Sequence, residues 1–219
     1  FRFEFFNEIP LSRGLGSSSA VIVSAIASAY AIEGIKVEKE RLLNLSLAYE
    51  SHPDNITPAV MGGFNVASVH ENEVKFITKS IPRTLRAVVV VPNRPISTTL
   101  SRKTLPYKYS KEDTIFNISH SSLLTAAFMS ENWEMLKYAS ADMVHQQFRM
   151  RHMPELFEVQ KTALKNGALM STLSGSGSTF FSVAYSEDSQ KLELALKEKF
   201  PHFRVMSVDF DNNGVKIEI

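Results

Sequence analysis

The chain has 219 residues, of which 44% are hydrophobic and 21% are charged, and its formal net charge is +1. This globular composition excludes fibrous and disordered classes, and the near-zero charge gives no electrostatic reason to expect nucleic acid or an anionic membrane as a partner. No cysteine occurs, which excludes disulfides and thiolate metal sites, and no apolar run reaches the roughly 18 residues of a membrane span.

The chain opens with a strand pattern that is followed by two helix patterns. Residues 1–6 alternate like a half-buried strand. Residues 20–32 are apolar on nearly every face, which predicts a buried helix capped by Gly34. A second helix is expected over residues 37–49, and Pro53 forbids its simple continuation.

Strand patterns follow on both sides of a candidate domain boundary. Residues 64–69 and 73–77 predict a hairpin, and residues 87–91 are β-branched and short enough for a buried strand. The boundary is expected between them, which divides the chain into residues 1–82 and 83–219.

The rest of the chain mixes helix and strand patterns. Helices are expected at residues 111–129, 133–150, 154–166 and 187–200, two strands within residues 168–184 joined through residues 174–178, and two further strands at the end. This mixed order favours an α+β protein.

The segment between the first strand and the first helix has the chemistry of an anion-binding loop. In Gly14-Leu15-Gly16-Ser17-Ser18-Ser19, glycines allow close backbone approach and the helix start offers unpaired amide hydrogens. A Walker loop would need a Gly-Lys-Ser/Thr ending, and a dinucleotide fingerprint would need glycine at Ser19. The alternative is a serine-rich helix cap on a structural turn.

At full length this segment resembles the second motif of the GHMP kinases, in which the loop wraps the nucleotide phosphates. The resemblance implies ATP binding along Pro10, Leu11, Ser12, Arg13, Gly14, Leu15, Gly16, Ser17, Ser18, Ser19 and Ala20. Residues 173–179 match the C-terminal glycine loop of the same family, except that Ser178 stands where proline is usual. We expect this exchange to loosen the loop.

Residues 52–63 closely resemble the His-Pro-Asp-Asn segment of the homoserine kinases within that superfamily. Two further segments carry Arg102 and Arg149, and the resemblance implies that these arginines bind the carboxylate of the substrate. Guanidinium groups suit carboxylates because they bind them bidentately. Taken alone, either arginine fits a surface charge, and Arg151 is close enough to Arg149 to be confused with it.

The resemblance implies transfer of the ATP γ-phosphoryl group to the side-chain hydroxyl of L-homoserine, a step of threonine biosynthesis in the cytoplasm. His52, Asn55 and Gly175 are expected to bind substrate, and Asp54 and Ser18 to support catalysis. Ser18 and a glutamate are expected to hold Mg²⁺. The position expected for that glutamate is Asn44, so Glu50 is the nearest candidate. The six histidines show no zinc-ligand spacing.

The implied fold is the two-domain GHMP kinase fold, of class α+β, in a homodimer. Residues 1–82 would form part of the N-terminal ATP-binding domain, of ribosomal-protein-like α/β type, and residues 83–219 a ferredoxin-like C-terminal domain. We expect a further segment before Phe1, and we expect residues 1–219 alone to be poorly soluble and inactive towards homoserine. The alternatives are another GHMP small-molecule kinase and a non-catalytic nucleotide-binding module.

Overall fold

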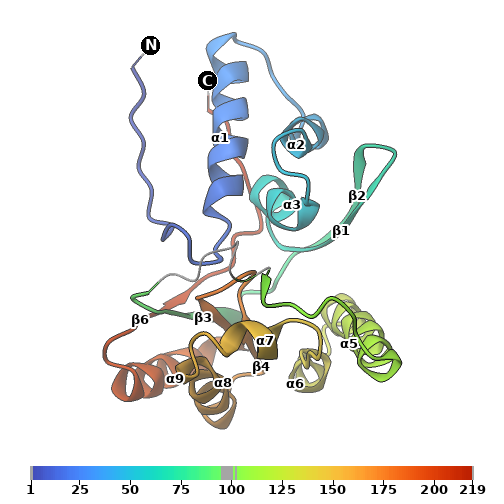
Figure 1. The fold of residues 1–219 in the computed structure, drawn as a ribbon. Helices are drawn as coiled ribbons and strands as arrows, with labels where there is room; N and C mark the ends of the chain where they lie inside the picture. The colour runs from blue at the N-terminus through green and yellow to red at the C-terminus, as the bar shows by residue number, and fades with distance from the viewer. Residues whose placement is uncertain (1, 95–100, 102, 219) are drawn as a thin grey trace.

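The computed structural model describes residues 2–94, 101 and 103–218, and these form an upper, mainly helical body above a four-stranded sheet (Figure 1). The upper body contains α1 (Ser17–Ile32), α2 (Lys39–Leu47), α3 (Pro53–Met61) and the antiparallel hairpin of β1 (Phe64–His70) and β2 (Glu73–Lys79). Its buried core includes Val23 of α1, Leu42 and Leu43 of α2, and Ile56 and Val60 of α3. None of the described helices is both long and apolar enough to cross a membrane.

Helix α3 is an element that the sequence analysis did not predict. Pro53 ends the possibility of one long helix, but it also occupies the first turn of a new one, where its missing N–H is not needed and its φ suits a helix. The Thr57 hydroxyl donates a hydrogen bond to the Pro53 carbonyl oxygen at 2.6 Å. Pro53 therefore starts a helix where we expected only a break.

Two expectations about the start of the chain are wrong in this structure. Residues 2–8 are extended but form no strand, because both sheets of the described residues are built without them and a strand needs a paired neighbour. Helix α1 is buried on one side only, at Ser19, Val23 and Ala27, since α2 and α3 pack against that side alone. The opposite side of α1 is open.

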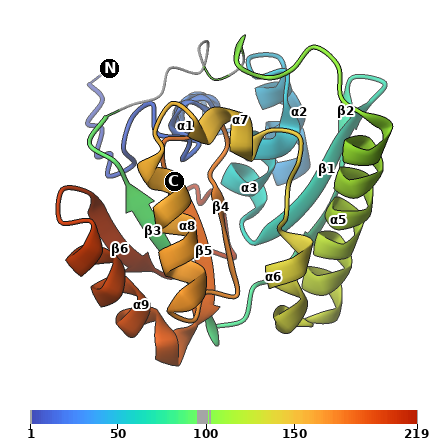
Figure 2. The ribbon, with the colours of Figure 1, turned by 60° about the horizontal axis from the view of Figure 1, so that its bottom comes forward.

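The lower body is a four-stranded antiparallel sheet. It contains β3 (Leu85–Val91), β4 (Met170–Leu173), β5 (Phe180–Tyr185) and β6 (Arg204–Val208) in the order β4-β5-β3-β6. With α8 (Glu155–Lys165) between β3 and β4, and α9 (Ser186–Lys199) between β5 and β6, the chain follows the β-α-β-β-α-β order of ferredoxin-like folds. Figure 2 shows α8 and α9 together on one face of this sheet.

Alternate residues of β3 supply the two faces of the lower core. Val88 and Val90 pack with α8 and α9, in a cluster that includes Leu156 and Leu196. Leu85 belongs to a second cluster on the other side. This period of two is the pattern of a strand covered on both faces, as the valine run predicts.

The helix expected over residues 133–150 is broken into three pieces, which corrects that prediction. Helix α5 (Lys111–Ser130) precedes them, and the pieces are η1 (Trp133–Met135), α6 (Leu136–Ala139) and α7 (Gln146–Met150). The break lies between α6 and α7, where Asp142 accepts hydrogen bonds from the backbone N–H groups of His145 and Gln146. A side chain that satisfies these amides starts a new helix and replaces the continuing one.

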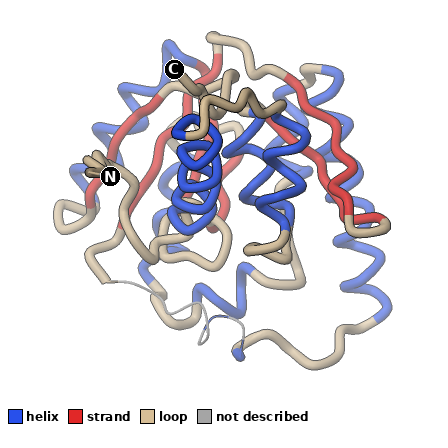
Figure 3. Tube along the Cα trace, turned by 90° about the horizontal axis from the view of Figure 1, so that it is seen from above, coloured by secondary structure: helices blue, strands red, loops and turns tan. Residues whose placement is uncertain are grey.

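The end of the chain also differs from expectation, because β6 is the only closing strand among the described residues. After β6 the chain returns to the upper body, where the Val215 N–H donates to the Val60 carbonyl at 3.2 Å and Val215 packs on the upper core. Figure 3 shows this C-terminal segment beside α1. The boundary between residues 82 and 83 stays a prediction, and residues 211–217 contact the body that precedes it.

Candidate active site

Two glycine-containing loops from the two bodies meet at the base of α1. We call residues 14–19 the first glycine loop and residues 174–178, between β4 and β5, the second glycine loop. The Ser174 hydroxyl donates to the Gly14 carbonyl at 2.7 Å, and the Thr179 N–H donates to the Arg13 carbonyl at 3.0 Å. The loops are thus held together by direct hydrogen bonds.

Glycine is required at the contact between the two loops. Gly14 has a φ of 78°, and a Cβ at this position would lie 2.1 Å from the Ser174 carbonyl oxygen. Gly16, the N-cap of α1, has a φ of 70°. Both positions have a left-handed backbone conformation, in which any residue other than glycine would be strained.

The first turn of α1 is built to receive an anion. Within the described part of the chain no side chain caps this helix, and its first turn has no acidic residue. Ser18 is exposed there, whereas Ser19 is buried. Amide hydrogens without an intrahelical partner, together with the helix dipole, favour a phosphate at this position.

A cleft of about 630 Å³ lies in front of this helix start. Its lining residues come from the two glycine loops, from α1 and α7, and from the segment that leads into α3. The lining residues are Leu11, Ser12, Arg13, Gly14, Leu15, Gly16, Ser17, Ser18, Ser19, Val21, Ile22, Glu50, His52, Asp54, Asn55, Arg149, Gly175 and Ser176. Most site residues that the sequence analysis named therefore face one space, although Pro10 and Ala20 do not line it. Arg102 lies outside the described residues.

The start of α3 brings polar side chains to the first glycine loop. The Asn55 side-chain amide donates to an Asp54 carboxylate oxygen at 3.2 Å. A Cβ on Gly16 would lie 3.5 Å from the Asn55 Oδ1. Asp54 and Asn55 are exposed, so both can reach a ligand in the cleft.

The geometry distinguishes Arg149 from Arg151. Arg149 Nη1 donates to the Gly175 carbonyl at 2.8 Å, at the edge of the cleft. Arg151 instead lies over the Phe148 ring, with 5.1 Å between its guanidinium carbon and the ring centre, and it does not line the cleft. A guanidinium that lines this cleft can bind a carboxylate or a phosphate.

The residues present fit a magnesium ion. Ser18 and Glu50 line the same cleft and offer hard oxygen donors. Asn44 has a different task, because its Oδ1 accepts a hydrogen bond from the Val74 N–H of β2 at 2.9 Å. The described residues include no group of three or more potential metal-binding side chains.

Ser178 anchors the second glycine loop, although we expected the loss of proline to loosen it. Its side chain is buried, and its hydroxyl donates to the Arg94 carbonyl at 2.9 Å. The Ser101 hydroxyl donates to the Ser176 carbonyl, also at 2.9 Å. Ser101 was not predicted as a site residue, since nothing in its local sequence pattern marks it.

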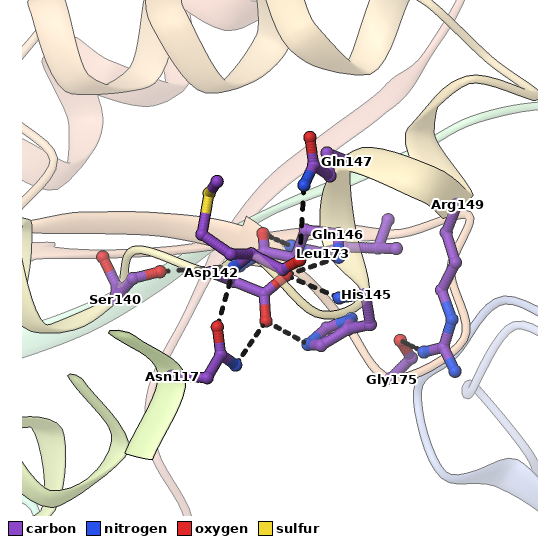
Figure 4. Close-up of polar contacts among 10 residues, drawn as sticks. Asn117, Ser140, Asp142, His145, Gln146, Gln147, Arg149, Leu173 and Gly175 are labelled. Carbon is purple, nitrogen blue, oxygen red and sulfur yellow. Dashed lines mark hydrogen bonds and ion pairs between the residues drawn. The ribbon is translucent and has the colours of Figure 1, made fainter. Parts of the chain in front are cut away.

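A buried polar cluster beside α7 was also missed (Figure 4). The Asp142 carboxylate accepts from Asn117 Nδ2 at 2.9 Å and from the His145 and Gln146 backbone amides at 2.8 and 2.7 Å. Burial alone would raise the pKa of Asp142, but these donors outweigh it and the pKa is lowered. An aspartate shortly before a helical run is a capping signal that could have located the break.

The pKa of the His145 ring lies below its ordinary value of 6.5. Burial lowers its pKa, the Arg149 charge lowers it further, and the Asp142 carboxylate only partly opposes this. His145 Nε2 lies 3.7 Å from Asp142 Oδ1, which is too long for a hydrogen bond. When the ring is neutral, His145 and Asp142 are therefore neither hydrogen bonded through Nε2 nor joined as an ion pair.

The fold and the two glycine loops define a GHMP kinase. The chain matches the N-terminal domain of the GHMP kinases over residues 1–63 and their C-terminal domain over residues 121–202. It is 83% identical over 219 residues to a homoserine kinase of Aliarcobacter butzleri, of which it covers 75%, and 52% identical over 218 residues to a homoserine kinase of Helicobacter pylori, of which it covers 74%. The chain belongs to the homoserine kinase family, the ATP-dependent GHMP kinases of threonine biosynthesis.

Solved structures agree with this assignment. The crystal structure of homoserine kinase from Cytophaga hutchinsonii superposes with a TM-score of 0.88 at 25% identity, covering 95% of this chain and 69% of that one. A mevalonate kinase structure superposes with a TM-score of 0.69 at 16% identity, covering 94% of this chain and 68% of that one, and it shows the fold alone.

Proposed function

We propose that the cleft binds ATP and L-homoserine side by side and transfers the γ-phosphoryl group to the homoserine hydroxyl. The observation that carries this proposal is the meeting of an open helix start, exposed polar groups of α3 and Arg149 around one space. Phosphoryl transfer depends mainly on aligning the two reactants and on neutralising charge over the phosphate oxygens. The cleft offers groups for both tasks.

The ATP phosphates lie along residues 10–20 in this proposal, with the backbone N–H groups of residues 14–19 donating to their oxygens. Gly14 and Gly16 let the backbone approach closely, and the dipole of α1 adds a fixed positive field. Because these donors are held in place before the reaction, they need little rearrangement as charge develops.

Ser18 and Glu50 would hold Mg²⁺ beside the phosphates. When bound, the ion neutralises negative charge on the phosphate oxygens. Glu50 supplies the carboxylate that position 44 lacks, and Asn44 is used to hold β2. Asp54 supports catalysis by fixing Asn55, whose side-chain amide donates to the Asp54 carboxylate.

Homoserine would lie between α3 and the second glycine loop. Arg149, with Arg102, binds its carboxylate, and His52, Asn55 and Gly175 contact the rest of the molecule. His52 and Asn55 line the cleft together with Arg149, which supports this arrangement. We also propose a homodimer in the cytoplasm, as the resemblance implies, and light scattering after size-exclusion chromatography tests the dimer.

The test of the proposal compares Arg149→Ala with Arg151→Ala in the full-length enzyme. Arg151 is a matched control, since it is the same residue type two positions away and does not line the cleft. Homoserine-dependent ADP release should lose about 2–5 kcal/mol in kcat/KM for Arg149→Ala, the usual cost of truncating one partner of a buried charge pair. Arg151→Ala should behave like the parent. Equal losses in both variants would refute the role of Arg149.

A further inference from the structure

A single carboxylate organises the segment that carries Arg149. The Asp142 side chain is only 7% exposed. One of its oxygens accepts from Asn117 Nδ2, on α5, and the other accepts from the backbone amides of His145 and Gln146, at the start of α7 (Figure 4). Asn117 is fixed in turn, because its Oδ1 accepts from the Met143 N–H at 2.7 Å. Asp142 thus joins α5 to the first turn of α7.

From α7 two side chains reach the second glycine loop. Gln146 Oε1 accepts from the Leu173 N–H at 2.9 Å, one residue before the loop, and Arg149 Nη1 donates to the Gly175 carbonyl within it (Figure 4). Between these two contacts lies Ser174, whose hydroxyl holds the Gly14 carbonyl of the first glycine loop. The contacts of α7 therefore hold the second glycine loop on both sides of Ser174, the residue that bonds to the first glycine loop.

Helix α7 cannot hold this position by itself. It has five residues, far fewer than the roughly 12 that an isolated helix needs to be even marginally stable. Buried Met150 anchors its end in the lower core, so the capped start at Asp142 and the packed end at Met150 together fix its direction. Without the cap, the orientation of Arg149 would depend on its own contacts.

We propose that Asp142 is a positioning residue for recognition of the substrate carboxylate. It does not touch the cleft, but it fixes the start of α7 and thereby the direction from which Arg149 enters. This inference rests on the proposed role of Arg149 as the group that binds the homoserine carboxylate. A small misplacement of such a group is costly, because binding and alignment need close geometry.

The test exchanges Asp142 and Asn117 in the full-length enzyme. Asp142→Asn keeps an oxygen for the two backbone amides but turns an NH₂ group towards the NH₂ group of Asn117. Asn117→Asp places two carboxylates against each other. The double variant restores the pairing, because the amide of residue 142 then donates to the carboxylate of residue 117. Asn117→Asp also serves as the second variant if Asp142→Asn does not fold.

The readouts are the KM for homoserine, the KM for ATP and the midpoint of thermal unfolding. Each single variant should raise the KM for homoserine about 10- to 100-fold with little change in the KM for ATP, and the double variant should recover most of this loss. An unchanged homoserine KM in both single variants, parallel changes in both KM values, or no recovery in the double variant would overturn the inference. Arg149→Ala, measured alongside, separates the two proposals: an unchanged homoserine KM there means that the proposed role of Arg149 itself is wrong.

Discussion

At the residue scale, the first glycine loop depends on the left-handed backbone conformations of Gly14 and Gly16 and on the residues packed beside them. Gly14 has no room for a side chain beside Ser174, whereas Gly16 has room but a left-handed φ. The two glycines therefore serve different ends: Gly14 joins the two loops, and Gly16 turns the chain into α1 next to Asn55. A substitution at Gly16 should consequently disturb the ligand more than the fold.

We predict that Gly16→Val abolishes ATP binding and lowers the free energy of unfolding by about 1–2 kcal/mol, the cost of a left-handed non-glycine residue. The valine side chain would project towards Asn55, at the mouth of the anion site. Gly34→Val is the matched control, because Gly34 follows the other end of α1 with a φ of 67° and open space around a Cβ. Titration calorimetry with ATP should find binding kept in Gly34→Val. Equal affinity in both variants would argue against the loop assignment.

We predict that Glu50→Gln raises the Mg²⁺ concentration needed for half-maximal rate, since a neutral amide is a weaker ligand for a hard cation than a carboxylate. Asn44→Glu is the control, because it adds a carboxylate on α2 beside Val74, away from the cleft lining. Its magnesium requirement should stay at the parent value. A magnesium titration in which Glu50→Gln matches the parent would leave Glu50 without a metal role.

At the element scale, short helices position the polar groups of the site, and their starts are set by single residues. Pro53 is the first residue of α3, and Asp142, four residues before Gln146, accepts from the first backbone amide of α7. In both cases a hydrophobic period gives little help, since five or nine residues hold too few turns to show one. The capping chemistry is visible in the sequence, since Asp142 is the only aspartate within residues 133–150. The hydrogen bond that it accepts from Asn117 is a tertiary contact that no local pattern shows.

The polar cluster at α7 makes the protein less stable in acid. Asp142 and His145 both have lowered pKa values, so the unfolded chain binds protons that the folded chain does not. The contribution of His145 is complete above its ordinary pKa of 6.5 and is lost as the pH falls below that value. The contribution of Asp142 is lost at lower pH, starting from its ordinary value of 3.8.

We therefore predict that the free energy of unfolding falls as the pH drops below 6.5, and that His145→Gln reduces this dependence. Urea unfolding on both sides of that pH measures it. His202→Gln is the control, since His202 is about half exposed and its ring contacts Glu155, which is not part of the Asp142 cluster. A pH dependence that His145→Gln leaves unchanged would show that this ring does not contribute.

Much of the fold was predictable because the patterns are long. The hairpin of β1 and β2, the strand β3 and the helices α5, α8 and α9 were all expected within a few residues. The loops were assigned through resemblance, since glycine and serine at a helix start are chemically ambiguous on their own. Residues 2–8 show the limit: an alternating pattern states which side chains could be buried, but pairing decides whether a strand forms.

At the scale of the whole molecule, the chain passes between the upper and lower bodies twice, near Ile81 and near Asn212, and these two crossing segments are hydrogen bonded to each other. Asn212 accepts from the Ile81 N–H at 2.8 Å and donates to the Ile81 carbonyl at 2.9 Å, at the point where the chain first leaves the upper body. Gly63 donates to the Asp211 carbonyl beside it. The returning C-terminal segment is thus hydrogen bonded to the chain on the N-terminal side of the predicted domain boundary.

We predict that Asn212→Ala lowers the free energy of unfolding by about 1–3 kcal/mol, because it leaves a donor and an acceptor of buried Ile81 without partners. Asn213→Ala is the matched control, as the Asn213 side chain bonds only to exposed Asp211 among the described residues. Denaturant unfolding compares the two variants. A loss in Asn213→Ala as large as that in Asn212→Ala would mean that the Ile81 contact is not the cause.

The central claim is that ATP and homoserine share the cleft between α1, α3 and the second glycine loop. A crystal structure of the full-length enzyme with homoserine and a non-hydrolysable ATP analogue tests it most directly. We predict the phosphates against the amides of residues 14–19, and the homoserine carboxylate within hydrogen-bonding distance of the Arg149 guanidinium. A homoserine molecule bound with its carboxylate remote from Arg149, or an analogue whose phosphates lie away from the start of α1, would contradict the account.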